Sequence, residues 1–186
     1  KFIVDDFKIR EKDAIYLLTH FHTDHYQGVI NKMSVYTTPL TADLLKTKSK
    51  CATTCLEFFK PIFINKVEIM AIPANHCPGA AMYILKFDNQ KILFTGDFKY
   101  DTQHSECESY QQYLSDVTQT FIDTTYFATK TVLEPQYQVI KRVLNALKPL
   151  IKQPNTKIIC QTYGVGKERM FEAIAKEFNI KFWPTA

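Results

Sequence analysis

The sequence predicts a mixed α/β fold, and three observations support this class. Short apolar runs bounded by turn residues, which are typical of strands, dominate the first two thirds of the chain. From Glu134 onward, apolar residues recur at helical spacing, and helices alternate with short apolar segments. The chain has 186 residues, 46% of them hydrophobic, which is enough for a sizeable core. We therefore expect a strand-rich part followed by an α/β part.

The strand-rich part has clear signals in chain order. Ala14 to Leu18 is a short apolar run suited to a buried strand. Thr38-Pro39 fits an N-cap followed by proline at the first helical position, which opens a helix to about Lys48. Asp88-Asn89 is a plausible hairpin turn between two strands. Further strands are expected at residues 67–71, 81–87 and 91–95.

The second part of the chain has a different pattern. Val139, Val143, Leu147 and Ile151 lie on one face of a helix spanning residues 134–151. Alternating helices and strands favour a parallel layer, because each helix returns the chain to the same end of the sheet. The expected elements after this helix are a strand at 156–161, a helix at 167–178 and a strand at 180–183.

Composition excludes several classes of protein. No apolar run approaches the roughly 18–20 residues that a membrane span requires, so we expect no membrane partner. The first 13 residues lack the apolar stretch of a signal peptide. The formal charge of +4 is compatible with a phosphate-rich partner but is too small to indicate a dedicated nucleic-acid-binding domain. Five cysteines, an odd number, favour a reducing compartment.

The strongest chemical signal is the segment Thr19-His-Phe-His-Thr-Asp-His25. Three imidazoles and a carboxylate fall within six residues, on the loop that leaves the strand ending at Leu18. Nitrogen and oxygen donors of this kind suit zinc. In a turn, His20 and His22 can face one ion while Asp24 and His25 reach a second ion beside it. A polar loop without metal is a poor explanation for so many histidines in one place.

Two isolated residues complete the set. His76 follows the strand at 67–71, and Asp97 follows the strand at 91–95. Each signal would be weak alone, since a single histidine or a Gly-Asp turn is usually structural. Together they supply a third nitrogen ligand and a bridging carboxylate for two metals about 3.5–4 Å apart.

These motifs resemble the metallo-β-lactamase superfamily, whose fold is an αββα sandwich with metals at one edge of its sheets. The residues flanking the ligands are more specific. The segments 18–26, 74–80, 94–98 and 123–126 resemble β-CASP nucleases of the DNA cross-link repair family. The resemblance runs from residue 2 to about residue 178. It implies a metallo-β-lactamase domain at residues 1–127 and the beginning of a β-CASP α/β insertion at residues 128–186.

The resemblance also assigns roles to individual residues. It makes His20, His22 and His76 ligands of a first Zn²⁺, with Asp97 bridging to a second position that Asp24 and His25 face. Asp97, Asp24 and Asp123 form the expected catalytic set, Asp123 lying near the scissile phosphate. Asp5, at the end of the opening strand, is expected to support the metal-binding histidines without contacting the metal itself. Thr125 and Lys167 are expected substrate contacts, although Gly164-Val-Gly-Lys167 fits a plain helix start equally well.

Family members bring a further histidine to the second metal from later in the chain. No such residue follows the β-CASP segment here, because the remaining histidine, His104, precedes Asp123. We therefore expect one tight zinc site and a second site that is weaker or empty. We also expect the sequence to be a piece of a longer protein rather than a protein that has lost these parts.

The function implied is a metal-dependent DNA nuclease, a 5′→3′ exonuclease of interstrand cross-link repair in the nucleus. Its expected partner is DNA, single-stranded or with a 5′-phosphate end. The RNA-processing branch of the same group typically has glycine where this chain has Asn75, and Glu-Ser-Thr-Tyr where it has Asp123-Thr-Thr-Tyr. A small-molecule hydrolase such as a thioesterase would lack the second α/β part. A non-catalytic subunit of the same fold is the remaining alternative.

Overall fold

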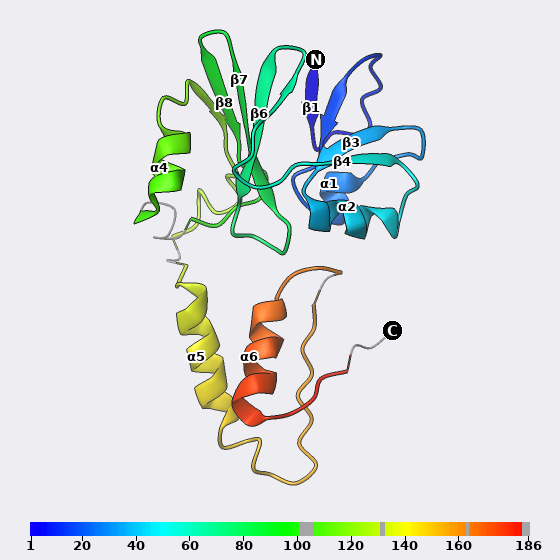
Figure 1. The fold of residues 1–186 in the computed structure, drawn as a ribbon. Helices are drawn as coiled ribbons and strands as arrows, with labels where there is room; N and C mark the ends of the chain where they lie inside the picture. Colours follow the sequence, from blue (N-terminus) through cyan, green and yellow to red (C-terminus); the bar gives the residue numbers. More distant parts are fainter. Residues whose placement is uncertain (101–105, 131–132, 163, 184–186) are drawn as a thin grey trace. The chain divides into compact units, whose positions relative to one another are not determined.

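The computed structural model describes residues 1–100, 106–130, 133–162 and 164–183. The chain divides into two compact units, Lys1–Phe127 and Ala128–Ala186 (Figure 1). The first unit contains two β-sheets, and the second contains two helices. None of the helices in the described part of the chain is long and apolar enough to cross a membrane.

The first sheet, here called the parallel sheet, contains four short strands in chain order. Each strand pairs only with its sequence neighbours, for example Ile3 with Tyr16 and Tyr16 with Val35. All four strands run in the same direction, so their carboxyl ends share one edge. Its strands are β1 (Phe2–Val4), β2 (Ile15–Leu17), β3 (Ser34–Thr37) and β4 (Ala52–Cys55).

The second sheet, here called the mixed sheet, has five strands, also in chain order. The first four are antiparallel, and the last is parallel to its neighbour. Phe87 pairs with Gln90, so Asp88-Asn89 is the two-residue hairpin loop that the sequence predicts. The strands are β5 (Ile62–Ile64), β6 (Val67–Pro73), β7 (Ala81–Phe87), β8 (Gln90–Phe94) and β9 (Gln119–Phe121).

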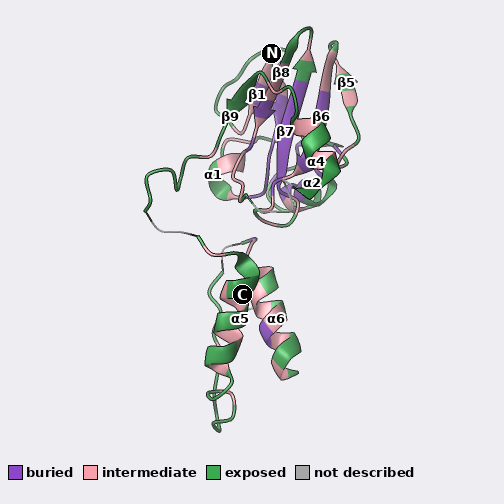
Figure 2. Cartoon of the chain, turned by 90° about the vertical axis from the view of Figure 1, so that its left-hand side faces the viewer, coloured by how far each residue is buried: buried purple, intermediate pink, exposed green. Residues whose placement is uncertain are grey.

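The two sheets pack face to face. Leu17 from the parallel sheet and Ile69, Tyr83 and Leu85 from the mixed sheet share one buried cluster. Figure 2 shows that much of β7 is coloured purple, as buried. Alternate residues of β6 and β7 point to the outer face of the mixed sheet, where they join a second cluster that α4 (Glu108–Leu114) covers. Helix α2 (Pro39–Lys46) contacts β4 at the parallel sheet. The predicted mixed α/β class, with two sheets between helices, is confirmed.

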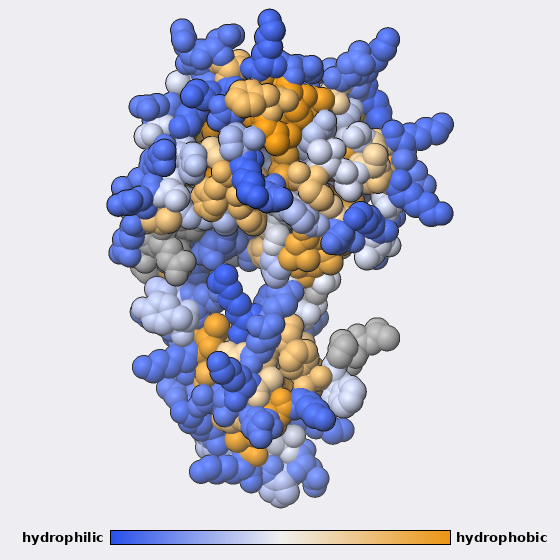
Figure 3. All heavy atoms as spheres, in the orientation of Figure 1, coloured by the Kyte–Doolittle hydropathy of each residue, from blue (hydrophilic) through white to orange (hydrophobic). Residues whose placement is uncertain are grey.

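The second unit differs from its prediction. Helices α5 (Gln136–Leu147) and α6 (Glu168–Phe178) form where helical spacing predicts them, and they pack against each other. The predicted strands at 156–161 and 180–183 are wrong, because within the described residues neither segment pairs with another strand. Isolated extended segments cannot satisfy their backbone groups by a ladder. Their apolar side chains remain exposed, Ile159 by 89% and Trp183 by 82%, and Figure 3 shows hydrophobic residues at the surface of this unit.

Candidate metal centre

The predicted site residues lie directly after five strands, at one edge of the first unit. Asp5 follows β1, the three histidines of the loop follow β2, His76 follows β6, Asp97 follows β8 and Asp123 follows β9. In the mixed sheet, β6, β8 and β9 run in the same direction, because two antiparallel pairings restore the orientation. The residues therefore emerge from carboxyl ends, and the fold brings together groups up to 118 positions apart (Asp5 to Asp123).

Four of these side chains form a tight cluster. One donor atom from each of His20, His22, His76 and Asp97 lies within 4.8 Å of the other three. His22 Nδ1 is 2.9 Å from His20 Nε2 and 3.1 Å from His76 Nε2. Asp97 Oδ2 is 3.9 Å from His20 Nε2 and 3.6 Å from His76 Nε2. Three imidazole nitrogens and one carboxylate oxygen thus converge on a common point.

This spacing fits a zinc ion. Zn–N bonds of about 2.0–2.1 Å at tetrahedral angles place two ligand nitrogens roughly 3.3 Å apart. The two nitrogen pairs centred on His22 Nδ1 are within 0.4 Å of that value. A set of three nitrogens and one oxygen is also a donor set that zinc accepts. The residues present therefore fit the metal that their order along the chain predicts.

His20 is the most deeply placed member of the cluster. Its side chain is fully buried, and its Nδ1 lies 3.0 Å from the Thr19 hydroxyl. Burial and the neighbouring histidines lower the pKa of His20 far below its usual range. Burial also lowers the pKa of His76, and the carboxylates of Asp97 and Asp123 oppose that shift without cancelling it. Both rings are therefore uncharged at neutral pH, and each keeps a lone pair on one of its two nitrogens.

His25 lies beside the cluster between two carboxylates. Its Nδ1 is 2.8 Å from Asp5 Oδ2, and its Nε2 is 3.2 Å from Asp97 Oδ1. Burial lowers the pKa of His25, but the hydrogen bonds to Asp5 and Asp97 and their charges outweigh it and raise the pKa to about 10. The hydrogen bond from His25 in turn lowers the pKa of Asp97. Asp24 is 80% exposed, with Oδ2 3.7 Å from His25 Nε2.

Asp123 and Thr125 lie together in the turn after β9. The backbone N–H of Asp123 donates to the Thr95 hydroxyl at 3.0 Å, and the N–H of Thr125 donates to Asp123 Oδ1 at 2.8 Å. The second bond closes a local side-chain turn that directs the carboxylate. Because Thr95 is two residues before Asp97, the bond from Asp123 places this turn beside the strand end that carries the carboxylate of the cluster.

Lys167 belongs to the second unit. It occupies the N-cap position of α6 in the left-handed backbone region, with φ of 66°. Glu168 Oε1 accepts a hydrogen bond from the Gly166 N–H at 2.7 Å. An anionic side chain therefore already occupies part of the helix start where a phosphate would bind.

Sequence reasoning missed two residues that hold the cluster in place. Thr19 is 1% exposed and hydrogen-bonds Asp5 through both its N–H (2.8 Å) and its hydroxyl (2.6 Å). Thr38 is the N-cap of α2 as predicted, but its hydroxyl makes no capping bond and instead donates to the Gly79 carbonyl at 2.6 Å. That bond fixes the loop carrying His76. Threonines are too common in sequences for either role to stand out.

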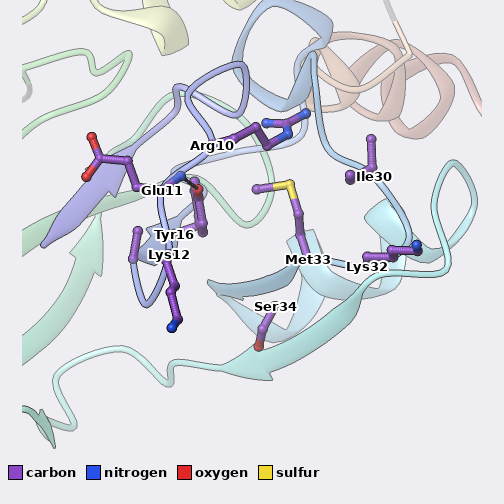
Figure 4. A pocket seen from close by; sticks show the side chains of 9 residues that line it. Arg10, Glu11, Lys12, Tyr16, Ile30, Lys32, Met33 and Ser34 are labelled. Carbon is purple, nitrogen blue, oxygen red and sulfur yellow. Dashed lines mark hydrogen bonds between the residues drawn. The ribbon is translucent and has the colours of Figure 1, made fainter.

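A separate depression of about 400 Å³ lies at the opposite end of the parallel sheet, near the starts of β2 and β3 (Figure 4). Its rim carries Arg10, Lys12 and Lys32. Arg10 donates to the Gly28 carbonyl at 2.7 Å, and the Tyr16 hydroxyl both donates to a carbonyl and accepts the Glu11 N–H at 3.1 Å. These bonds anchor the loop before β2, so we interpret the depression as a structural feature.

Comparison with known proteins identifies relatives along nearly the whole chain. No protein-family model matches. The chain is 34% identical over 97% of its length to the human (Homo sapiens) DNA cross-link repair 1A protein, of which it covers 18%. It is 27% identical over 95% of its length to the chicken (Gallus gallus) 5′ exonuclease Apollo, of which it covers 39%. A crystal structure of a protein of unknown function from Enterococcus faecalis V583 is similar in fold, with a TM-score of 0.64 at 15% identity over 92% of this chain and 46% of that one.

A two-sheet α/β sandwich with histidines and aspartates gathered at the carboxyl ends of its strands is the architecture that the sequence resemblance to the metallo-β-lactamase class predicts. Within this class the chain is a homologue of the DNA cross-link repair proteins. It spans about a fifth of the length of the human 1A protein, 18%.

Proposed function

We propose that the chain is part of a zinc-dependent nuclease that hydrolyses phosphodiester bonds in DNA from a 5′ end and acts in interstrand cross-link repair in the nucleus. The observation that carries the proposal is the convergence of His20, His22, His76 and Asp97 on one point. The names of the relatives, a cross-link repair protein and a 5′ exonuclease, support the substrate and the polarity.

Each side chain of the cluster has a distinct role in the proposed reaction. When bound, zinc supplies the Lewis acidity that activates water and neutralises charge on phosphate oxygens. His20, His22 and His76 would hold it through Nε2, Nδ1 and Nε2 respectively. Asp97, kept ionised because its pKa is lowered by the hydrogen bond from His25, orients the attacking water. Asp5 anchors the loop through Thr19 and His25.

We also propose one tight zinc position and a second, weaker position formed by Asp24 and His25 with Asp97 shared. His25 is protonated near neutral pH, because its pKa is about 10, and must release a proton before it can ligate. The Asp24 side chain is mostly exposed, so the fold does little to hold its carboxylate in place for a metal. Both features disfavour the second position relative to the first.

Substrate contacts complete the proposal. Asp123 and Thr125 lie in the turn after β9 beside the cluster and would approach the scissile phosphate from that side. Lys167 is the proposed contact from the second unit. The division into compact units at Phe127 supports a metallo-β-lactamase domain at residues 1–127 and the beginning of a β-CASP insertion at 128–186. A single-stranded or 5′-phosphorylated DNA end is the proposed substrate.

The substitution Asp97→Asn tests the function. It keeps the shape of the side chain, removes its charge and weakens it as a zinc ligand, so turnover of 5′-phosphorylated single-stranded DNA should fall at least about 10²–10³-fold. Asp43→Asn is the matched control, because Asp43 is exposed on α2 and, within the described residues, its ion pair is with Lys46 of the same helix. Metal titration of the purified protein should give one tight equivalent of zinc.

Three results would count against the proposal. A well-folded Asp97→Asn variant that cleaves at the parental rate would remove the catalytic role of the cluster. Cleavage of RNA in preference to DNA would move the chain to the RNA-processing class. Metal binding without any cleavage by the parent protein would favour a non-catalytic subunit.

A further inference from the structure

The residue before the first histidine ligand, Thr19, links the backbone of the loop to Asp5. Its hydroxyl oxygen lies 2.6 Å from Asp5 Oδ2 and 3.0 Å from His20 Nδ1. Its N–H donates to Asp5 Oδ1 at 2.8 Å, and its carbonyl accepts the Ala81 N–H at 3.0 Å. Thr19 and His20 are both buried, so water does not supply these contacts.

Counting protons fixes the direction of each bond. A threonine hydroxyl has a single proton to donate, and an ionised carboxylate only accepts. Asp5 accepts from the Thr19 N–H, from the Thr19 hydroxyl and from His25 Nδ1. With its proton committed to Asp5, the Thr19 oxygen is left as an acceptor toward His20. His20 Nδ1 must therefore carry the ring proton, which leaves a lone pair on Nε2.

We propose that Thr19 is a positioning residue that fixes the tautomer and the ring orientation of His20 for metal binding. The inference deepens the proposed metal-dependent function and rests on it. His20 Nε2 is the atom that lies 2.9 Å from His22 Nδ1, inside the cluster. One carboxylate, Asp5, thereby orients two imidazoles: His25 by a direct bond and His20 through the hydroxyl of Thr19.

The geometry at Gly96 shows that the position of Thr19 is tightly fixed. A Cβ atom at Gly96 would lie 2.7 Å from Thr19 Oγ1 and 2.8 Å from Thr19 Cβ. The strand end that carries Asp97 therefore packs directly on Thr19. The Thr19 side chain therefore contacts both Asp5, which supports the loop, and the backbone of Gly96, which precedes Asp97.

Two substitutions separate a hydroxyl role from a packing role. Thr19→Val keeps a branched side chain and removes the hydroxyl, whereas Thr19→Ser keeps the hydroxyl and removes the methyl group. Zinc affinity, measured by competition with a chromophoric chelator, should fall about 10–100-fold in Thr19→Val, the usual loss when a partner of a ligating histidine is removed. It should stay within about threefold of the parent in Thr19→Ser.

Nitrogen-15 NMR of the histidine rings in metal-free protein provides a second readout. In the parent and in Thr19→Ser, His20 should be protonated on Nδ1; in Thr19→Val, that preference should be lost. The parent spectrum is informative even if Thr19→Val fails to fold, since His20 protonated on Nε2 in the parent would overturn the inference. Equal loss of affinity in both variants, or no loss in Thr19→Val, would also overturn it. If the parent binds no zinc but shows the predicted tautomer shift between variants, the proposed function fails while the role of Thr19 in orienting His20 stands.

Discussion

Gly96 is the position where a single methyl group should have a measurable effect on the site. It has a φ of +51°, in the region that residues with a side chain rarely adopt. Adding Cβ places it 2.7–2.8 Å from three atoms of Thr19, which is itself fixed by Asp5. The left-handed conformation costs alanine about 1–2 kcal/mol. Forcing Thr19 aside costs about 1–3 kcal/mol, and reduced freedom of the unfolded chain returns about 0.4–1 kcal/mol.

Gly96→Ala should therefore lower the free energy of unfolding by roughly 1–5 kcal/mol. Urea denaturation of the parent and variant proteins, followed by circular dichroism, measures this difference. Gly164→Ala is the matched control, because among the described residues no atom beyond its chain neighbours lies within 4 Å of a Cβ built there. If Gly96→Ala unfolds within about 0.5 kcal/mol of both the parent and the control, the close packing of Gly96 on Thr19 is refuted.

Two further predictions concern pH and a buried carbonyl. Burial lowers the pKa of His25, but hydrogen bonds to two carboxylates outweigh burial and raise the pKa to about 10. The contribution of His25 to stability is therefore complete below its ordinary pKa of 6.5 and is lost as the pH rises toward 10. Burial lowers the pKa of His20, so the free energy of unfolding also falls as the pH drops below 6.5. Urea denaturation of chelator-treated protein should therefore show the largest free energy of unfolding near pH 6.5. A free energy of unfolding that rises steadily to pH 9 would contradict this. Tyr83 and Thr37 both donate to the Leu18 carbonyl at 2.7 Å, so Tyr83→Phe or Thr37→Val alone should cost about 0.5–1.5 kcal/mol. The double variant should lose more than the sum, because the carbonyl is then unsatisfied, and strict additivity in thermal unfolding would argue against it.

The long strands of the first unit were predictable because their sequences are unambiguous. Residues 81–87 and 91–95 are apolar runs separated by a two-residue turn, and the observed strands begin and end within one residue of the prediction. The strands β3, β4 and β9 have three or four residues each and little apolar periodicity. Such short strands form because neighbours pair with them, and a sequence pattern does not show which neighbours are present.

The predicted strands at 156–161 and 180–183 failed for the same reason. Both have strand-like residues, yet no described strand lies beside either to complete a ladder. Local preference for an extended backbone is too weak to produce a strand alone.

The convergence of His20, His22, His76 and Asp97 was predictable because so many histidines close together in a sequence usually share one site. Their sequence order also placed them at strand ends, where parallel strands bring side chains together. The residues around them were not predictable to the same degree. The side-chain amide of Asn75, next to His76, donates to the Lys99 carbonyl at 3.3 Å, and the Thr19 hydroxyl bridges Asp5 to His20. Both roles depend on contacts between segments that are distant in sequence, and no local motif encodes them.

The cluster draws its members from both sheets. His20 and His22 follow a strand of the parallel sheet, whereas His76 and Asp97 follow strands of the mixed sheet. A cation held by all four would tie one sheet to the other, and a ligand present at 100 times its dissociation constant adds about 2.7 kcal/mol to stability. Metal occupancy would then report on tertiary assembly as well as on the ligands. A substitution deep between the sheets, such as one at Leu85, should release the ion without touching any residue that holds it.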